Sequence, residues 1–165
     1  MIRARVRRAF NARRAIWRGA RLGRGVRINR ASHFTASTTI GDFANFNGMT
    51  VSGRGRVYIG RYFHSGSQCL IIPDNHNYDH GSAIPYGPGM EDVSKEVIIE
   101  DFVWIGDRVI VLGGVTLGEG CIIQAGSVVT KSVPPGAIAG GHPARIFGYR
   151  DRNHFERLKA LGRFH

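Results

Sequence analysis

The chain has 165 residues, 23 of them glycine, and a formal net charge of +11 at pH 7. This length suits one domain with a sizeable core, so residues 1–165 are predicted to form a single domain. No apolar run approaches 18 residues and the N-terminus lacks the apolar segment of a signal peptide, so we expect no transmembrane helix and a cytoplasmic protein.

Residues 1–21 are predicted to form a basic N-terminal cap. Eleven of the 23 basic residues lie between Arg3 and Arg30, and the first acidic residue is Asp42. Apolar residues recur among these arginines at roughly helical spacing. This pattern favours either a solvated helix packed on the end of the fold, or peripheral contact of residues 1–30 with an anionic membrane at its inner face. No nucleic-acid-binding motif accompanies the charge, so we expect no nucleic-acid partner.

A six-residue repeat occupies the second half of the chain, from Ile99 to Pro134. Each unit opens with an aliphatic residue and carries a small or β-branched residue four positions later. The opening residues are Ile99, Ile105, Val111, Leu117, Ile123 and Val129. Neither an α-helix nor a plain strand has this period, whereas three such units per turn make a parallel β-helix whose opening residues point inward.

The same repeat runs earlier, so residues 22–72 and 97–134 are both predicted to form β-helix coils. It keeps its phase from Leu22 to Phe46 and resumes at Ile59, with one extra residue that we assign to a bulge at Ser52–Arg56. In this phase Thr50 points inward. The two cysteines of the chain also take inward positions, which indicates buried thiols rather than a disulfide framework.

The repeat stops between Pro73 and Glu96, and residues 73–96 contain proline, glycine, histidine and charged residues instead. An insertion of this length in a compact domain is usually functional, and we expect it to reach outward from one corner. His76 is the main candidate in it, because a loop histidine can act as a general base near neutral pH. Asp79 is a candidate carboxylate to fix its tautomer, whereas His80 and Asp74 are weaker candidates.

Residues 135–165 are predicted to form a C-terminal extension that includes a short amphipathic helix over residues 149–161. The flat faces and open ends of a solenoid are commonly covered by caps and by assembly around a threefold axis. We therefore expect a homotrimer in which the loop of one subunit reaches over its neighbour.

Several hexads resemble a known family. Residues 42–47 read DFANFN, residues 103–106 read VWIG, residues 125–131 read AGSVVTK, and Pro134-Pro135 is followed by GHPAR at 141–145. Together they are similar to the hexapeptide-repeat acyltransferases, most closely the branch of galactoside, maltose and polysaccharide O-acetyltransferases. The resemblance covers residues 22–147 and implies an all-β fold, a left-handed parallel β-helix.

The resemblance also implies an activity, which is transfer of acetyl from acetyl-CoA to a hydroxyl of a sugar or of a polysaccharide or glycolipid precursor. His76 would be the general base, and Asn45 would bind the acceptor near the reacting hydroxyl. Asp79 and Trp104 would line the acceptor cleft. Active sites of this family lie between subunits, so His76 would face a cleft that a neighbouring subunit completes.

For the coenzyme, the resemblance assigns contacts to six residues, which are Trp104, Ala125, Gly126, Thr130, Lys131 and Arg145. Small residues allow the close approach of a pantetheine chain, and Lys and Arg suit phosphates. No metal is expected. Gly148 stands where the galactoside enzyme has a second basic residue, and Arg150 or Arg152 could replace that contact.

Several alternative functions stay open. Residues 1–21 lack the acidic acceptor-binding residue of the small-sugar enzymes, which favours a glycan under assembly on a lipid or nucleotide carrier. Transfer to a streptogramin-type antibiotic or to an amino sugar is an alternative on the same fold. A non-catalytic assembly module is another. A γ-carbonic-anhydrase-like metalloenzyme would need three zinc ligands, and the sequence offers no complete set in the right phase.

Overall fold

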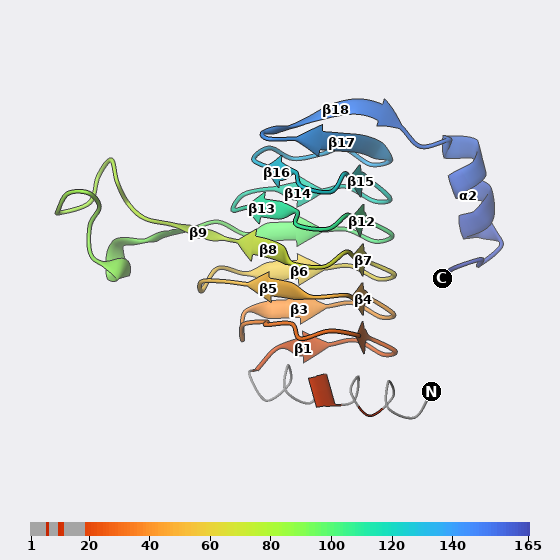
Figure 1. Ribbon diagram of the computed structural model, residues 1–165, viewed down its shortest axis with the longest axis horizontal. Coiled ribbons are helices and arrows are strands. Elements are labelled where there is room, and N and C mark those ends of the chain that lie inside the picture. The colour runs from red at the N-terminus through yellow and green to blue at the C-terminus, as the bar shows by residue number, and fades with distance from the viewer. Residues whose placement is uncertain (1–5, 7–9, 12–18) are drawn as a thin grey trace.

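The computed structural model describes residues 6, 10–11 and 19–165, which form a left-handed parallel β-helix with a long loop on one side and a helix on the other (Figure 1). Each strand of a face pairs in parallel with strands one coil away. The first face contains β1 (Arg21–Leu22), β3 (Thr38–Ile40), β6 (Val57–Ile59), β11 (Val97–Ile99) and β14 (Thr116–Leu117). The second contains β5 (Met49–Val51), β8 (Cys69–Ile72), β13 (Ile110–Leu112) and β16 (Val128–Val129).

The third face contains strand residues of the candidate functional site. Its parallel strands are β2 (Arg27–Ile28), β4 (Asn45–Phe46), β7 (His64–Ser65), β12 (Trp104–Ile105), β15 (Ile122–Ile123) and β17 (Ala137–Gly141). The last strand, β18 (Ala144–Tyr149), folds back antiparallel on β17 and ends the sheet. The coil therefore closes with a hairpin rather than with an open parallel edge.

The inward positions of the repeat form the core, as predicted. Every opening residue from Ile99 to Val129 is at most 1% exposed, and the small positions of the same coils are buried as well. Cys69 and Cys121 are free, buried thiols. Burial raises the pKa of both, that of Cys121 to about 12, so neither is a reactive thiolate near neutral pH.

The predicted phase is wrong at Thr50, which is exposed, whereas Met49 and Val51 on either side are buried. The corner after Phe46 is one residue shorter than its equivalent in the next coil, because Phe46 to Val51 spans five positions and Ser65 to Ile71 spans six. The following segment at 52–56 is two residues longer than one hexad allows. The net change is the single residue that the sequence indicates, but it is the sum of two opposite changes.

One corner of the coil is a column of residues in the left-handed backbone region. Glycine occupies both ends, with Gly25 at one end and Gly120 and Gly136 at the other. Aromatic residues occupy the middle at Phe43, Tyr62 and Phe102, with φ of 60°, 53° and 60°. A non-glycine residue in this region costs about 1–2 kcal/mol. The three rings stack in sequence, with centroids 5.0 and 5.5 Å apart, which offsets part of this cost.

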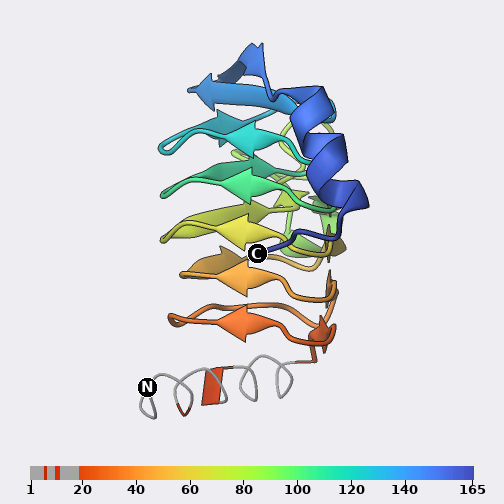
Figure 2. The same cartoon turned by 90° about the vertical axis from the view of Figure 1, so that its right-hand side faces the viewer.

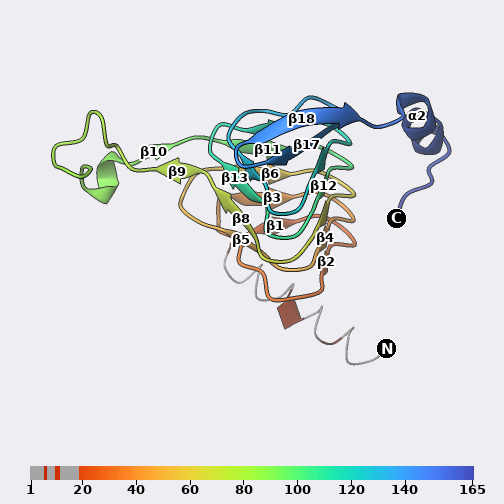
Figure 3. The ribbon, with the colours of Figure 1, turned by 45° about the horizontal axis from the view of Figure 1, so that its top comes forward.

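The loop leaves the coil after β8 and extends away from the solenoid (Figures 1 and 3). Its base is a short antiparallel pair, β9 (Asp74–Asn75) and β10 (Val93–Ser94), and it contains one 3₁₀ turn at Gly89–Glu91. The loop returns to the first face at β11. Residues 73–96 therefore extend outward from the coil, as predicted.

The C-terminal helix α2 (Arg152–Ala160) runs along the side of the coils that carries the aromatic column (Figure 2). It begins three residues later than the predicted helix because Tyr149 belongs to β18. Asp151 caps it by accepting a hydrogen bond from the backbone N–H of His154. Phe155 contacts the ring of Phe102 edge-on, with centroids 6.0 Å apart.

Most of the predicted N-terminal cap lies outside the described residues. One described contact reaches from this segment to the first coil, where the side-chain amide of Asn11 donates to the carbonyl of Ile28 at 3.1 Å. In the part of the chain that the structure describes, no helix has both the length and the apolar character to cross a membrane.

Candidate active site

His76 lies in the loop and is held on two sides. Its Nδ1 is 2.8 Å from Oδ1 of Asp92, and its ring stacks on Tyr86 with centroids 3.8 Å apart and planes 5° apart. The His76 side chain is 52% exposed, whereas that of Asp92 is 17% exposed. The ring is therefore fixed in orientation but open to an incoming molecule.

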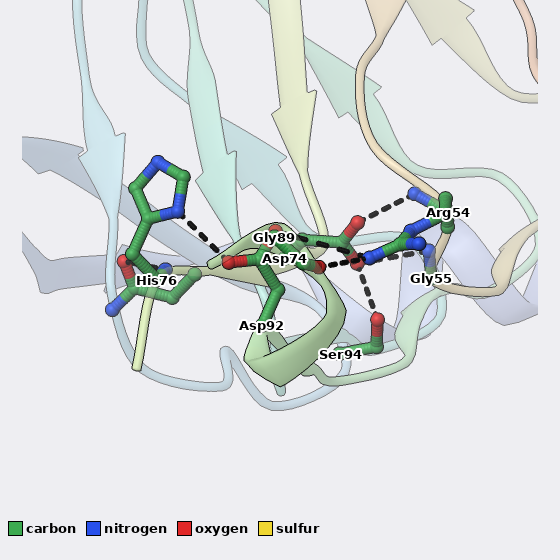
Figure 4. A network of polar contacts seen from close by, with 8 residues as sticks. Arg54, Gly55, Asp74, His76, Gly89, Asp92 and Ser94 are labelled. Carbon is green, nitrogen blue, oxygen red and sulfur yellow. Dashed lines mark hydrogen bonds and ion pairs between the residues drawn. The ribbon is translucent and has the colours of Figure 1, made fainter. Parts of the chain in front are cut away.

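The carboxylate of Asp92 is held in place in turn by Arg54, which belongs to the lengthened segment at 52–56. The Arg54 guanidinium donates to the carbonyl of Gly89 and lies 3.9 Å from Oδ2 of Asp92 (Figure 4). The extra residues of this segment thus form a support for the loop. Arg54 itself is 68% exposed, so this ion pair positions Asp92 more than it stabilises the fold.

Asp74 fastens the base of the loop to the same segment. Its carboxylate accepts hydrogen bonds from the backbone N–H groups of Arg54 and Gly55, and from the hydroxyl of Ser94 at 2.8 Å (Figure 4). Burial raises the pKa of Asp74, but these hydrogen bonds outweigh burial and hold its pKa below the ordinary value. Asp74 is therefore a structural carboxylate, and it does not contact His76.

This geometry sets the tautomer of His76. A carboxylate only accepts hydrogen bonds, so Nδ1 carries the proton that it donates to Asp92. In the neutral ring Nε2 then has a free lone pair and can accept a proton. The sequence pointed to Asp79 as a possible partner, but Asp92 has this role and Asp79 is exposed.

Asn45 and Trp104 lie on the third face, in one outward row. The row is defined by strand register, in which Asn45 pairs with His64 and His64 pairs with Trp104. Adjacent strands are about 4.8 Å apart, so Asn45 and Trp104 are separated by about 10 Å with His64 between them. Trp104 is 51% exposed, so its ring is open to a ligand rather than packed at the corner.

The side chain of Asn45 is oriented by its neighbours. Its Oδ1 accepts from Nδ2 of Asn29 at 2.6 Å, and the same Nδ2 lies 2.9 Å from Oδ1 of Asn47. With its oxygen engaged, the amide of Asn45 presents its N–H₂ group to the outside. That group can donate to the oxygen of a hydroxyl. The role of Asn29 was not predicted from the sequence.

His76 and the Asn45–Trp104 row are not brought together within one chain. The loop extends from one side of the solenoid, whereas β4, β7 and β12 lie on the opposite side (Figure 1). The candidate base and the candidate acceptor residues therefore cannot meet unless a second copy of the chain supplies one of them.

Apart from Trp104 on β12, the residues predicted to contact a coenzyme lie exposed on the last coils and on β18. They are Ala125, Gly126, Thr130, Lys131 and Arg145. The space beside Gly126 is open, because a Cβ built there would meet nothing within 4 Å. Arg150 is already engaged, since its Nε donates to the carbonyl of Gly120 and its guanidinium lies over the Phe155 ring. Arg152 is exposed.

Sequence reasoning missed Asp92, Tyr86, Arg54 and His64. Asp92 and Tyr86 are separated from His76 by a stretch without periodicity, so no sequence pattern connects them to His76. In the described residues, no group of three or more His, Cys, Asp or Glu side chains is arranged to hold a metal ion.

Known proteins share both the sequence pattern and the fold of this chain. The family described as "Bacterial transferase hexapeptide (six repeats)" matches residues 96–131. A hexapeptide-repeat containing acetyltransferase from Vibrio cholerae O1 biovar eltor, solved in complex with acetyl coenzyme A, superposes with a TM-score of 0.69 at 32% sequence identity. The match covers 81% of this chain and 72% of that chain. The chain belongs to the hexapeptide-repeat acetyltransferase family.

Other members of the hexapeptide-repeat family are similar over shorter shares. The galactoside O-acetyltransferase of Lactococcus lactis is 34% identical over 110 residues, which is 64% of this chain and 49% of that protein. A 2,3,4,5-tetrahydropyridine-2,6-dicarboxylate N-acetyltransferase of Staphylococcus aureus is 50% identical over 53 residues, which is 32% of this chain and 22% of that protein. The chain spans about half the length of the curated relatives it matches.

Proposed function

We propose that this protein is an acetyl-CoA-dependent acetyltransferase that acetylates a hydroxyl of a sugar or of a glycan precursor. The observation that carries the proposal is the His76–Asp92 contact on an exposed loop, since it leaves Nε2 of His76 available as a proton acceptor. The family match and the acetyl coenzyme A complex of the Vibrio relative support the choice of coenzyme. The galactoside O-acetyltransferase relative supports a hydroxyl acceptor.

Acetyl-CoA supplies an acetyl group activated as a thioester. Nε2 of His76 removes the proton of the acceptor hydroxyl as its oxygen attacks the thioester carbonyl carbon. When the carbon–sulfur bond breaks, the imidazolium returns this proton to the departing thiolate. The products are an acetyl ester and free CoA. The carboxylate of Asp92 stabilises the charged ring between the two proton transfers.

We propose that the working form is a homotrimer with active sites between subunits. The support is the separation of the loop from the row of Asn45, His64 and Trp104 within one chain (Figure 1). In a threefold assembly each subunit gives His76 to one site and the outward row to another. Asn45 donates to the acceptor hydroxyl, and Trp104 and Asp79 line the cleft.

The coenzyme groove is proposed along the corner that contains Ala125 and Gly126. Pantetheine lies against their exposed backbone, and Thr130, Lys131 and Arg145 contact the nucleotide end, with Trp104 beside the thioester. All of these positions are exposed on adjacent coils, which supports a continuous path. Because Arg150 is engaged with Gly120, Arg152 is the arginine that remains for a further phosphate contact.

A second acceptor class is an amine. The support is the Staphylococcus N-acetyltransferase, which is 50% identical over 53 residues. His76 serves an amine as well as a hydroxyl, because both acceptors lose one proton during attack on a thioester. The two classes differ in the product, which is an amide instead of an ester and resists mild alkali.

Peripheral contact of residues 1–30 with an anionic membrane is also proposed. Arg21, Arg24, Arg27 and Arg30 are all exposed at the same end of the solenoid. Each basic residue near an anionic surface contributes about 1 kcal/mol of attraction. Cosedimentation with phosphatidylglycerol vesicles, and not with phosphatidylcholine vesicles, is the expected result.

The proposed activity is tested by thiol release from acetyl-CoA with a panel of sugars, sugar nucleotides, amino sugars and hydroxylated antibiotics. Release that requires a sugar or glycan hydroxyl, and that is lost in the His76→Ala variant, is expected. Release with antibiotics or amines alone would replace the proposed acceptor. Equal release by wild type and the variant would contradict the role of His76.

A further inference from the structure

The tail that follows α2, residues 161–165, turns back onto the coils. Gly162 lies in the left-handed backbone region with φ of 62°, and the N–H of Arg163 donates to the carbonyl of Leu158. This arrangement ends a helix and reverses the direction of the chain. Figure 2 shows α2 beside the coils and the chain end returning from it across them. The tail therefore lies against the solenoid.

The end of the tail contacts the aromatic column and the third face. The ring of Phe164 packs against those of Tyr62 and Phe102, with centroids 4.6 and 5.1 Å apart. The carbonyl oxygen of His165 lies 2.8 Å from Nε2 of His64, and the two imidazole rings are stacked with centroids 5.3 Å apart. A carbonyl oxygen only accepts, so Nε2 of His64 is the donor. Phe164 is still 40% exposed, so the tail rests on the surface of the coils.

His64, on which the tail rests, is the central residue of the outward row on the third face. Strand register places Asn45 on one side of His64 and Trp104 on the other. Adjacent strands are about 4.8 Å apart, so each of these residues is one strand away from His64. His165 therefore lies between the residue proposed to bind the acceptor hydroxyl and the residue proposed to lie beside the thioester. An acceptor oxygen at Asn45 cannot reach the thioester along this row while the tail stays in place.

The tail also closes a cavity. A space of about 500 Å³ lies between the coils on one side and α2 with its tail on the other. The described residues that line it include His64 and Trp104 of the outward row, but not Asn45. The cavity therefore ends at His165, and the tail divides the row into two parts. Movement of the tail away from His64 would join the cavity to the surface around Asn45.

We propose that residues 161–165 are a strap that closes the acceptor row, and that the acceptor displaces His165 from His64. The inference rests on the proposed acetyltransferase function and concerns the regulation of the same site. In the closed state the carbonyl oxygen of His165 occupies the donor of His64 that an acceptor oxygen takes in the open state. Gly162 is the hinge, because glycine has a permissive backbone and a Cβ built there would meet nothing within 4 Å. The closed fraction of the enzyme reduces its apparent affinity for the acceptor.

Chemical modification of the histidines in the full chain tests the closed state. Diethyl pyrocarbonate acylates accessible imidazoles, and mass spectrometry of the peptides gives the rate at each one. His64 should react more slowly than His142, which is exposed and serves as the internal reference. Phe164→Ala should raise the rate at His64 about tenfold or more, because the ring contact that closes the tail is lost. Leu161→Ala is the matched control, since Leu161 is 60% exposed in the same tail, and it should leave both rates unchanged. Equal rates at His64 in wild type and Phe164→Ala would overturn the strap.

Kinetics with each acceptor that is active in the thiol-release panel test the competition. Phe164→Ala should lower the acceptor KM about tenfold, whereas kcat and the KM for acetyl-CoA should stay within about twofold of wild type. An unchanged or higher acceptor KM would overturn the strap, because the tail would then be a fixed wall of the site. Faster modification of His64 in Phe164→Ala, without thiol release from any acceptor, would instead overturn the acetyltransferase proposal and support the closed tail.

Discussion

Nδ1 of His76 lies 2.8 Å from a carboxylate oxygen of Asp92, a residue sixteen positions further along the chain. The loop folds back on itself to make this contact, because β9 and β10 pair and Arg54 ties the 3₁₀ turn to the coil. The loop is therefore a small structural unit that holds one imidazole. This contact orients the ring of His76 as its proposed role of general base requires.

The first prediction concerns the base itself. His76→Ala should lower kcat for acetyl transfer by roughly 10²–10⁴-fold, because general-base assistance is lost. His80→Ala is the matched control in the same loop, and it should stay within a few-fold of wild type. Circular dichroism and sedimentation should be unchanged for both variants. Activity of His76→Ala within a few-fold of wild type would remove this residue as the base.

The second prediction concerns the tautomer. Asn at position 92 can donate to Nδ1, which would move the ring proton to Nε2 and block its role as an acceptor. Asp92→Asn should therefore lower kcat by roughly 10²–10⁴-fold while the KM for acetyl-CoA changes little. Asp79→Asn, at the residue that the sequence favoured, should affect the acceptor KM at most. The reverse pattern would assign the carboxylate role to Asp79.

The third prediction concerns close packing at the corners. A Cβ at Gly106 would lie 2.6 Å from the backbone nitrogen of Ala125, with no side-chain end to give way. Gly106→Ala should therefore lower the free energy of unfolding by about 1–3 kcal/mol, as overpacking does. Gly148→Ala is the control, since its nearest neighbour is 3.9 Å away at Ile138. Equal melting temperatures for the two variants would contradict this packing.

The fourth prediction follows from corner carboxylates. Asp42 accepts a hydrogen bond from the backbone N–H of Arg24, and Asp107 accepts one from the backbone N–H of Ser67. These bonds hold the pKa of both carboxylates below the ordinary value of 3.8. A depressed folded-state pKa means that the stabilisation is complete above the unfolded value and is lost as the pH falls through the folded one. The melting temperature should therefore fall below about pH 4. Asp107→Asn should show a smaller acid-induced decrease than wild type in thermal scans from pH 6 to pH 2.

Much of the fold was predictable because the β-helix repeats one physical requirement. An inward residue such as Ile105 must stack on its equivalents one coil away, so the sequence repeats at the spacing of the coil. The exception is Thr50, where a shortened corner and a lengthened one nearly cancel. A count of residues between Phe46 and Ile59 reveals only their sum.

The candidate site could be identified in part from the sequence, and the catalytic and binding roles of its residues stay predictions. His76 stood out because it lies where the repeat fails, and Asn45 and Trp104 because their hexads match a family. Asp92 and Tyr86 were missed because contacts inside an irregular loop depend on its three-dimensional path, which leaves no period in the sequence. The cavity beside α2 was missed for a similar reason, since it depends on how the tail docks on Tyr62 and Phe102.

The most direct test of a site shared between subunits is complementation between two inactive variants. The His76→Ala and Asn45→Ala variants, each of which is expected to be inactive alone, are mixed in equal amounts, unfolded and refolded together. If His76 and Asn45 of one site come from different subunits, about a quarter of the sites regain both residues and activity returns to about that fraction of wild type. Mixed trimers without any recovered activity would contradict the account, because both residues would then belong to a site within one chain.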